Sequence, residues 1–534
     1  MKKSILAVFC SAFLLTLDAA DGIETDRVEV GALHHPHLKV SVWDLRDRTD
    51  GVGELVQKRE WLLLHGTADV ELMANVVDVQ DVVTGKGTVY LRLAPLPGSR
   101  NWEGPDFKIM PGSEEGLAVI ERDCRTLQIP YVNGEIGRRT ALMQAQRELR
   151  PYVSGRDGLF LSNTWGDRNR DSRLCESFMM KETEAAGRLG VDVVQIDDGW
   201  QKGRTANSAA AKGKGVWDGY WASDPEFWKP DPVRFPRGLK PLVEAAAAKG
   251  MRLGLWFGPD SSNDAANWEK DADQLLDYHR TYGISYFKID SLKTRSPESL
   301  RHQAQLFEKV LKESDRRIVC DLDVTAERRP GYFGLPEIGP VFVENRYTDW
   351  HKYWPHQTLR QFWSLCDVVD PVRLRMEFLN PLRHRDKYAG DPLAPSAWPI
   401  ESTFATVMLG SPLGWFEVSG LAPETMDRLA PFVATWKQHR DRLHAGVVHP
   451  IGAKPDGISW TGFVVKGASG LDVILFRELN RQADFTLDLS PFGEAMKSVQ
   501  VLSPRGSAKT EGVNLSVNVP EKLDFIWVVL GSDR

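Results

Sequence analysis

The stretch GISYFKIDSL, residues 283–292, has the pattern of a strand that ends in charge. Phe287 and Ile289 are apolar, whereas Lys288 and Asp290 lie among them two residues apart. A strand that is buried on both faces rarely carries charged residues in its interior. Because alternate residues of a strand point to the same side, we expect Lys288 and Asp290 to share one face.

A strand followed by a helix recurs on both sides of this stretch, over roughly 260 residues. The intervening helical segments include CESFMMKETEAAGRLG (175–190) and LKPLVEAAAAKG (239–250), and each ends in glycine. Eight such repeats predict the α/β class and a (β/α)8 TIM barrel. An open, doubly wound sheet is the alternative, but NTWGDRNR (163–170) is not the glycine-rich first turn that it needs. The expected strands are LFLSNTW (159–165), VDVVQIDD (191–198), RLGLWF (252–257), YFKID (286–290), RIVCDL (317–322), VFVEN (341–345), VRLRMEF (372–378) and VMLGSPLGWFEV (407–418).

The segments on either side of the expected barrel, which covers residues 154–443, have a different pattern. Residues 21–153 contain short apolar runs split by turn signals, with a glycine-rich hairpin in VTGKGTVYLRLAPLPG (83–98). Residues 444–534 contain short alternating strands without helices between them. We therefore expect a β-sandwich domain on each side of the barrel.

The N-terminus, MKKSILAVFCSAFLLTLDAADG, has the pattern of a secretory signal. Two lysines precede an apolar run that is too short to span a membrane, and small residues follow it. We expect residues 1–20 to be a signal peptide and the mature chain to be secreted or periplasmic. No other segment is apolar enough for a bilayer, so no membrane partner is expected after its removal.

Composition excludes several other classes of function. With 534 residues, 42% hydrophobic and 26% charged, the chain is typical of soluble globular proteins, and a net charge of -6 argues against a nucleic-acid partner. The cysteines outside the signal form no CxxC pair, and HHPH (34–37) is interpreted as a solvated turn. We therefore expect no metal and no cofactor. The 18 tryptophans suit either a large core or stacking on sugar rings.

Polar and aromatic side chains gather where the expected strands end. In a TIM barrel, these carboxyl-terminal strand ends carry the functional residues. One aspartate at such a position is often the N-cap of the next helix, but several on one barrel predict a site. The residues in question are Asn163, Trp165, Asp197, Asp198, Trp200, Trp256, Asp260, Lys288, Asp290, Cys320, Asp321, Asp323, Glu344, Arg346, Asp349, Trp415 and Glu417.

The pair formed by Lys288 and Asp290 indicates the chemistry. An ammonium beside a carboxylate favours the charged form of both groups, and an ionised aspartate can act as a nucleophile. A structural salt bridge at the barrel mouth is the alternative. Carboxylates and aromatic residues without a metal-ligand cluster favour glycoside hydrolysis, which in retaining enzymes needs a nucleophile and a second carboxylate as acid and base.

Three motifs carry a resemblance to a known family. QIDDGW (195–200), RLGLWFGPD (252–260) and YFKID (286–290) resemble the α-galactosidase clan, in particular glycoside hydrolase family 36 with its raffinose-synthase-like members, and less closely family 27. The resemblance implies that Asp290 is the nucleophile and that Lys288 contacts the sugar. It also implies that Asp197 and Asp198 bind the 4- and 6-hydroxyls of galactose, and that Trp256 is the aromatic residue of the GLWF stretch.

The same resemblance implies that Asp349 is the acid/base, with Arg346 as its neighbour and a sugar ligand. Glu344 is the alternative acid, and Asp349 could instead begin a helix as its N-cap. Cys320 matches a cysteine of the family's fifth strand, but the glycine-rich run that should follow it is missing from CDLDVTAERRPGYFG (320–334). The strand-end residues Trp165, Trp200 and Trp415 are further expected substrate contacts.

We therefore predict a secreted, retaining, exo-acting α-galactosidase-like glycoside hydrolase whose partner is a carbohydrate substrate. One alternative is an α-galactosyltransferase of the raffinose-synthase type. Another is a hydrolase of a related sugar such as a β-L-arabinopyranoside. A non-catalytic carbohydrate-binding protein is the alternative from a different class.

Overall fold

The computed structural model describes residues 26–32, 38–45, 53–62, 70–72, 74–95, 107–111, 117–122, 124–323, 332–343, 346–493 and 498–531. The expected signal peptide, the HHPH turn and Glu344 lie outside these residues.

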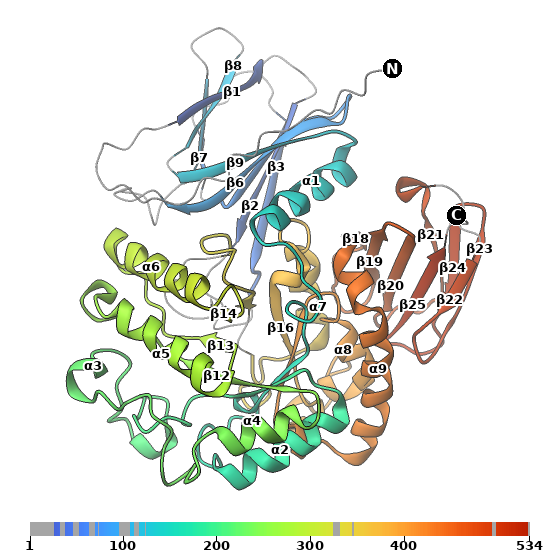
Figure 1. The fold of residues 1–534 in the computed structure, drawn as a ribbon. Helices are drawn as coiled ribbons and strands as arrows, with labels where there is room; N and C mark the ends of the chain where they lie inside the picture. Colours follow the sequence, from blue (N-terminus) through green and yellow to red (C-terminus); the bar gives the residue numbers. More distant parts are fainter. Residues whose placement is uncertain are drawn as a thin grey trace, which may run out of the picture.

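Eight parallel strands close into a barrel in which the strands follow one another in chain order (Figure 1). Every strand overlaps one of the eight stretches expected from the sequence, so the (β/α)8 prediction is confirmed. The strands are β10 (Leu161–Asn163), β11 (Val193–Ile196), β12 (Arg252–Phe257), β13 (Tyr286–Ile289), β14 (Val319–Asp323), β15 (Val341–Val343), β16 (Leu374–Phe378) and β17 (Ser411–Trp415).

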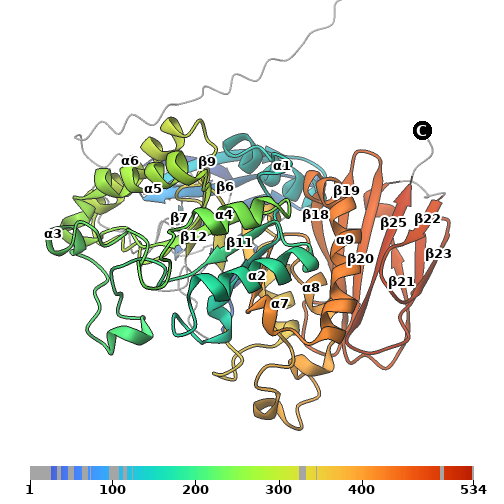
Figure 2. The same cartoon turned by 60° about the horizontal axis from the view of Figure 1, so that its bottom comes forward.

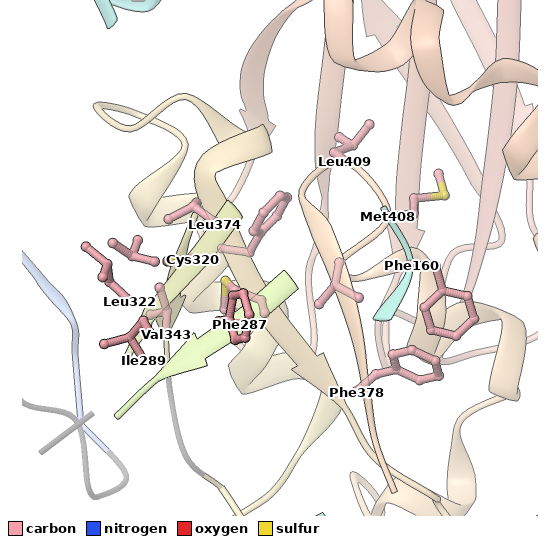
Figure 3. Packing of buried hydrophobic residues seen from close by; sticks show 14 of the residues in the cluster. Phe160, Phe287, Ile289, Cys320, Leu322, Val343, Leu374, Phe378, Met408 and Leu409 are labelled. Atoms are coloured by element: carbon pink, nitrogen blue, oxygen red, sulfur yellow. The ribbon is translucent and has the colours of Figure 1, made fainter. Parts of the chain in front are cut away.

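Helices surround the barrel and pack on its outer face. The sequence explains several helix ends: α2 ends at Gly190, which has a φ of 87°, and α6 begins with a capping box at Ser296 followed by Pro297. Figure 3 shows part of the apolar layer between strands and helices, with Phe287, Ile289 and Leu322 in it. The helices are α2 (Glu176–Leu189), α3 (Tyr220–Ser223), α4 (Lys240–Ala247), α5 (Trp268–Tyr282), α6 (Pro297–Glu313), α7 (Pro355–Leu365), α8 (Ile400–Ala405) and α9 (Pro423–Ala445).

Two antiparallel sheets precede the barrel, with strand orders β3-β2-β5-β6-β9 and β1-β8-β7-β4. The expected hairpin joins β5 to β6, and a helix, α1 (Gly134–Leu149), which was not expected from the sequence, follows β9. Asp367 of the barrel domain accepts hydrogen bonds from Trp43 Nε1 at 2.9 Å and from Arg138 Nη2 at 2.6 Å, which joins this region to the barrel. The strands are β1 (Asp26–Ala32), β2 (Leu38–Leu45), β3 (Val56–Leu62), β4 (Val70–Leu72), β5 (Val76–Asp81), β6 (Lys86–Pro95), β7 (Phe107–Pro111), β8 (Leu117–Arg122) and β9 (Cys124–Tyr131).

Two further antiparallel sheets follow α9, which lies between them and the barrel (Figures 1 and 2). Val464 and Leu475 of one sheet share a core with Leu515 and Val517 of the other, as a β-sandwich requires. The strands are β18 (Val447–Gly452), β19 (Trp460–Gly467), β20 (Gly470–Arg477), β21 (Asp484–Asp488), β22 (Ser498–Val501), β23 (Ser507–Glu511), β24 (Asn514–Asn518) and β25 (Asp524–Gly531). Among the described residues, no helix has the length and apolar character needed to cross a membrane.

Candidate active site

The inner face of the barrel carries both apolar and charged side chains. Strand register pairs Lys288 of β13 with Trp256 of β12 and with Asp321 of β14, so these residues share the inner face. Below them lies an inner apolar cluster that includes Leu161, Val193, Tyr286, Val319, Phe342 and Leu413. The expectation that the lysine of YFKID points into the barrel is confirmed.

Lys288 is the positive centre of this inner face. Its Nζ lies 3.3 Å from Asp197 Oδ2 and 3.8 Å from Asp323 Oδ2. It also lies 4.9 Å from the ring centre of Phe342 and 4.7 Å from that of Trp415. Burial favours the neutral amine, but the neighbouring carboxylates, Asp197 first among them, outweigh it and raise the pKa of Lys288 above its ordinary value. The ammonium is therefore charged at every working pH.

Asp290 directly follows β13 and is half-buried. Its Oδ1 accepts a hydrogen bond from the Ser291 amide at 2.6 Å, and its Oδ2 accepts one from Trp256 Nε1 at 3.2 Å. Its own amide donates to the Phe257 carbonyl at 2.9 Å, and Ser291 has a φ of 55° in the left-handed region. Backbone and side-chain partners therefore fix the direction of this carboxylate, as a nucleophile requires.

The two adjacent aspartates after β11 have different partners. Asp197 Oδ2 accepts hydrogen bonds from Asn163 Nδ2 at 2.7 Å and from Lys288. Asp198 Oδ1 instead accepts from Gln201 Nε2 at 2.8 Å, and its Oδ2 accepts from the Thr205 hydroxyl. Burial raises the pKa of Asp198 to about 7, against the opposing effect of those two hydrogen bonds. Asp197 thus belongs to the barrel interior, whereas Asp198 holds the loop that follows β11.

The aromatic residues expected at the site divide into two groups. Trp165 and Trp415 belong to the inner cluster, and Trp256 donates to Asp290. Trp200 lies instead in the outer layer, where its ring packs against Tyr278 of α5 and its Nε1 donates to the Trp256 carbonyl at 2.9 Å. This place in the outer layer, away from the inner face that carries Lys288, does not support the expectation that Trp200 contacts substrate.

The prediction that Cys320 contacts substrate is wrong. Cys320 is the second of the five residues of β14, and three residues separate it from the carboxyl-terminal end of the strand at Asp323, counting Asp323 itself. Alternation turns its side chain into the layer between the barrel and its helices, beside Phe287 and Leu322 (Figure 3). The residues that β14 directs inward are Asp321 and Asp323.

Asp349 and Arg346 lie in the loop between β15 and α7. Because α7 begins at Pro355, with Trp354 as its N-cap residue, Asp349 does not cap a helix. Asp349 is half-buried, and its Oδ1 is buried without a hydrogen-bond partner among the described residues. Arg346 is buried, and its amide donates to Glu377 Oε1 at 2.7 Å.

Three other strand-end carboxylates have structural partners. Asp260 Oδ1 accepts from the Gly219 amide at 2.7 Å, and Glu417 Oε2 accepts from Arg173 Nη1 at 2.6 Å. Asp321 is paired with Arg375 at 2.9 Å inside the barrel. No group of three or more His, Cys, Asp or Glu side chains in the described part of the chain could hold a metal ion.

Comparisons with known proteins support the resemblance. No family model matches the chain. Among curated proteins, it is 34% identical to an alpha-galactosidase of Escherichia coli over 86 residues, which is 16% of this chain and 10% of that protein. It is 28% identical to alpha-galactosidase 2 of Pediococcus pentosaceus over 144 residues, which is 27% of this chain and 16% of that protein. The chain therefore matches less than a fifth of the length of these relatives.

Solved structures extend the similarity to nearly the whole chain. The alpha-galactosidase from Lactobacillus brevis matches with a TM-score of 0.65 and 12% identity, over 95% of this chain and 75% of that one. A variant of the GH36 alpha-galactosidase AgaA from Geobacillus stearothermophilus, in complex with 1-deoxygalactonojirimycin, matches with a TM-score of 0.63 and 13% identity, over 95% and 76%. At such identities these matches concern the fold alone. The chain thus resembles α-galactosidases in sequence over short segments, and those of glycoside hydrolase family 36 in fold over nearly its whole length.

Proposed function

We propose that this protein is a retaining, exo-acting glycoside hydrolase that removes terminal α-linked galactose, or a galactose-like sugar, from oligo- or polysaccharides. The observation that carries the proposal is the cluster of Asp197, Trp256, Lys288 and Asp290 on the inner face of the barrel at its carboxyl-terminal end. The curated relatives named alpha-galactosidase support the choice of sugar.

In the first step, the ionised Asp290 attacks the anomeric carbon of the sugar. A bond forms between a carboxylate oxygen and that carbon, while the bond from the carbon to the glycosidic oxygen breaks. Asp349, in its protonated form, gives its proton to the departing oxygen, which keeps the bonding electron pair. The aglycone leaves as an alcohol, and the sugar remains as an ester of Asp290.

In the second step, water attacks the same anomeric carbon from the side that the aglycone left. Asp349, now a carboxylate, takes a proton from that water, and the bond to Asp290 breaks with its electron pair returning to the carboxylate. Two inversions restore the original configuration, and both side chains return to their starting states. The Trp256 Nε1 hydrogen bond to Asp290 stabilises the carboxylate when it re-forms.

Recognition of the sugar is assigned to the charged groups around Lys288. A carboxylate such as Asp197 accepts hydrogen bonds from hydroxyls, and an ammonium donates to them, at roughly 1.5–3 kcal/mol for each charged bond. In the proposed binding mode, the anomeric carbon lies at Asp290 and an axial 4-hydroxyl bonds to Asp197 and Lys288. We propose that this arrangement selects galactose over glucose.

The N-terminal segment supports an extracytoplasmic location. The lysines and short apolar run of residues 1–20 have the pattern of a cleaved signal, and an outward enzyme would meet polysaccharides in excess water. N-terminal sequencing of the protein from cell fractions of its host tests this. We expect a mature chain that begins near residue 21 outside the cytoplasm, and an intact Met1 in the cytoplasm would contradict it.

A screen of nitrophenyl glycosides, with the first-formed sugar followed by NMR, tests the activity. We expect the α-galactoside to be cleaved fastest and α-galactose to appear before its β-anomer. Initial release of β-galactose would show inversion and contradict the double displacement. Galactose binding without turnover of any glycoside would favour the carbohydrate-binding alternative.

A further inference from the structure

Arg168 extends from the loop after β10 to the loop that carries Asp349. It follows a short 3-10 helix, Thr164–Asp167, and has a φ of 59° in the left-handed region, which is rare for a residue with a side chain. Gly166 allows this path, since a Cβ there would lie 1.9 Å from the Trp415 carbonyl oxygen. The loop therefore crosses closely over the end of β17.

Two aromatic rings hold the guanidinium of Arg168. Its Cζ lies 4.5 Å from the ring centre of Tyr347 and 4.1 Å from that of Trp350. These two residues lie on either side of Asp349 in the sequence, and their rings contact each other edge to face at 4.7 Å. The rings that contact the guanidinium therefore belong to the same loop as Asp349.

The guanidinium also faces the carboxylate itself. Arg168 Nε lies 4.0 Å from Asp349 Oδ2, and the side chains are 16% and 25% exposed. Nε is buried and donates no hydrogen bond to the described residues, and Asp349 Oδ1 is buried and accepts none. Oδ2 of Asp349 thus faces a cation, while Oδ1 has no hydrogen-bond partner among the described residues.

We propose that Arg168 is a positioning residue for Asp349, an inference that rests on the proposed function. A proton on the carboxyl group is disfavoured on Oδ2, which faces the cation, so it lies on Oδ1. From Oδ1 it passes to the glycosidic oxygen as the bond to the anomeric carbon breaks and the electron pair stays with that oxygen. The carboxylate that remains is then stabilised by the guanidinium. Arg168 itself exchanges no proton.

The dependence on leaving group separates this role from a structural one. Protonation matters most for an alcohol leaving group and least for dinitrophenolate, which departs without a proton. Loss of positioning should therefore slow cleavage of melibiose much more than that of dinitrophenyl α-galactoside. Loss of folded protein would lower both rates by the same factor, so the ratio of the two kcat/KM values is insensitive to it.

The experiment compares Arg168→Ala, Arg168→Lys and Asp349→Ala with the wild type on both substrates. Arg173→Ala is the matched control, because Arg173 lies on the same loop but pairs with Glu417. We expect Arg168→Ala to lower kcat/KM for melibiose on the order of 10-fold or more and that for the dinitrophenyl substrate by less than about threefold. Arg168→Lys should recover part of the loss, and Arg173→Ala should leave the ratio unchanged.

Two outcomes overturn the inference, and they differ in what they leave standing. If Asp349→Ala changes the ratio and Arg168→Ala does not, Asp349 remains the acid and Arg168 does not position it. If Asp349→Ala leaves the ratio unchanged, Asp349 is not the acid, and the role of Arg168 falls with it. A changed ratio in both variants supports the inference.

Discussion

The two sides of the barrel mouth differ in how they hold their acidic groups. On the side of β11 to β13, Asp197 and Asp290 directly follow strands, and each carboxylate accepts at least two hydrogen bonds. On the side of β15, Asp349 lies in a loop, and its Oδ1 accepts none from the described residues. A nucleophile must be aimed before the substrate arrives, whereas an acid must keep an oxygen available for a leaving group. The difference therefore agrees with the roles proposed for Asp290 as nucleophile and Asp349 as acid.

The largest effect should come from a substitution on the side of β11 to β13. Asp290→Asn removes the proposed nucleophile but keeps the size of the side chain, so we expect kcat for α-galactosides to fall on the order of 10⁴-fold or more with the fold retained. Circular dichroism checks the fold, and Asp315→Asn at an exposed aspartate is the control. Mass spectrometry after a 2-deoxy-2-fluoro-galactosyl inactivator should find the label on Asp290. A label on another residue would remove Asp290 from this role.

Asp349→Ala should give the next largest effect and a different signature. The general acid contributes about 10²- to 10⁴-fold where the leaving group needs a proton, so melibiose cleavage should fall within that range. Formation of the covalent intermediate from a dinitrophenyl galactoside should change little. Added azide should speed its breakdown and give α-galactosyl azide, detected by NMR. If Glu344→Ala shows this rescue and Asp349→Ala does not, the acid is Glu344.

Side-chain directions on the side of β11 to β13 were easier to predict from the sequence than those on the side of β15. The two-residue spacing of Lys288 and Asp290 fixes a common face, and the structure confirms the inward direction of Lys288. The expectation for Cys320 came instead from the resemblance, and the register pairs this residue with Phe287, on the opposite face from Lys288 and Asp321. Alternation along β13 and β14 thus predicts the directions of both Lys288 and Cys320, whereas the match to a family position did not.

The contacts of the loop that carries Asp349, after β15, could not be predicted in the same way. No period in NTWGDRNR indicates that Arg168 reaches the rings beside Asp349, because that contact depends on two loops far apart in the sequence. Trp200 shows the same limit, since it lies four residues beyond β11 and packs on α5 rather than facing the barrel interior. Loop residues need tertiary contacts to be placed, whereas barrel strand residues need only their register.

A smaller effect should separate Asp197 from the catalytic residues. Asp197→Asn replaces a charged acceptor beside Lys288 with a neutral one, so we expect kcat/KM for α-galactosides to fall on the order of 10- to 100-fold. Selectivity for galactosides over glucosides should fall with it, measured as the ratio of kcat/KM for the two nitrophenyl sugars. An unchanged ratio would show that Asp197 does not bind the 4-hydroxyl that distinguishes galactose from glucose.

Asp198→Asn should give the smallest effect on activity, although the resemblance implies that Asp198, like Asp197, binds a hydroxyl of galactose. Its oxygens are bound by Gln201 and Thr205, and an asparagine can keep both hydrogen bonds, so kcat/KM should change by less than about threefold. A fall as large as that of Asp197→Asn would show that Asp198 contacts the sugar after all.

The effect of Asp198 should appear in stability against pH. Its folded-state pKa of about 7 lies above the value of about 3.9 in an unfolded chain. Between these values the native state keeps a proton that the unfolded state has lost, so the contribution of Asp198 to stability falls as pH rises from about 4 to 7 and is level above that.

The Asp198→Asn variant tests this, because asparagine does not titrate. We therefore expect the free energy of unfolding of Asp198→Asn minus that of the wild type, measured by urea denaturation, to increase by up to about 4 kcal/mol from pH 4 to pH 8. Asp315→Asn should show no such gain. A constant difference between Asp198→Asn and the wild type would mean that Asp198 is ionised in the native state across this range, and that the loop after β11 holds a charge rather than a proton.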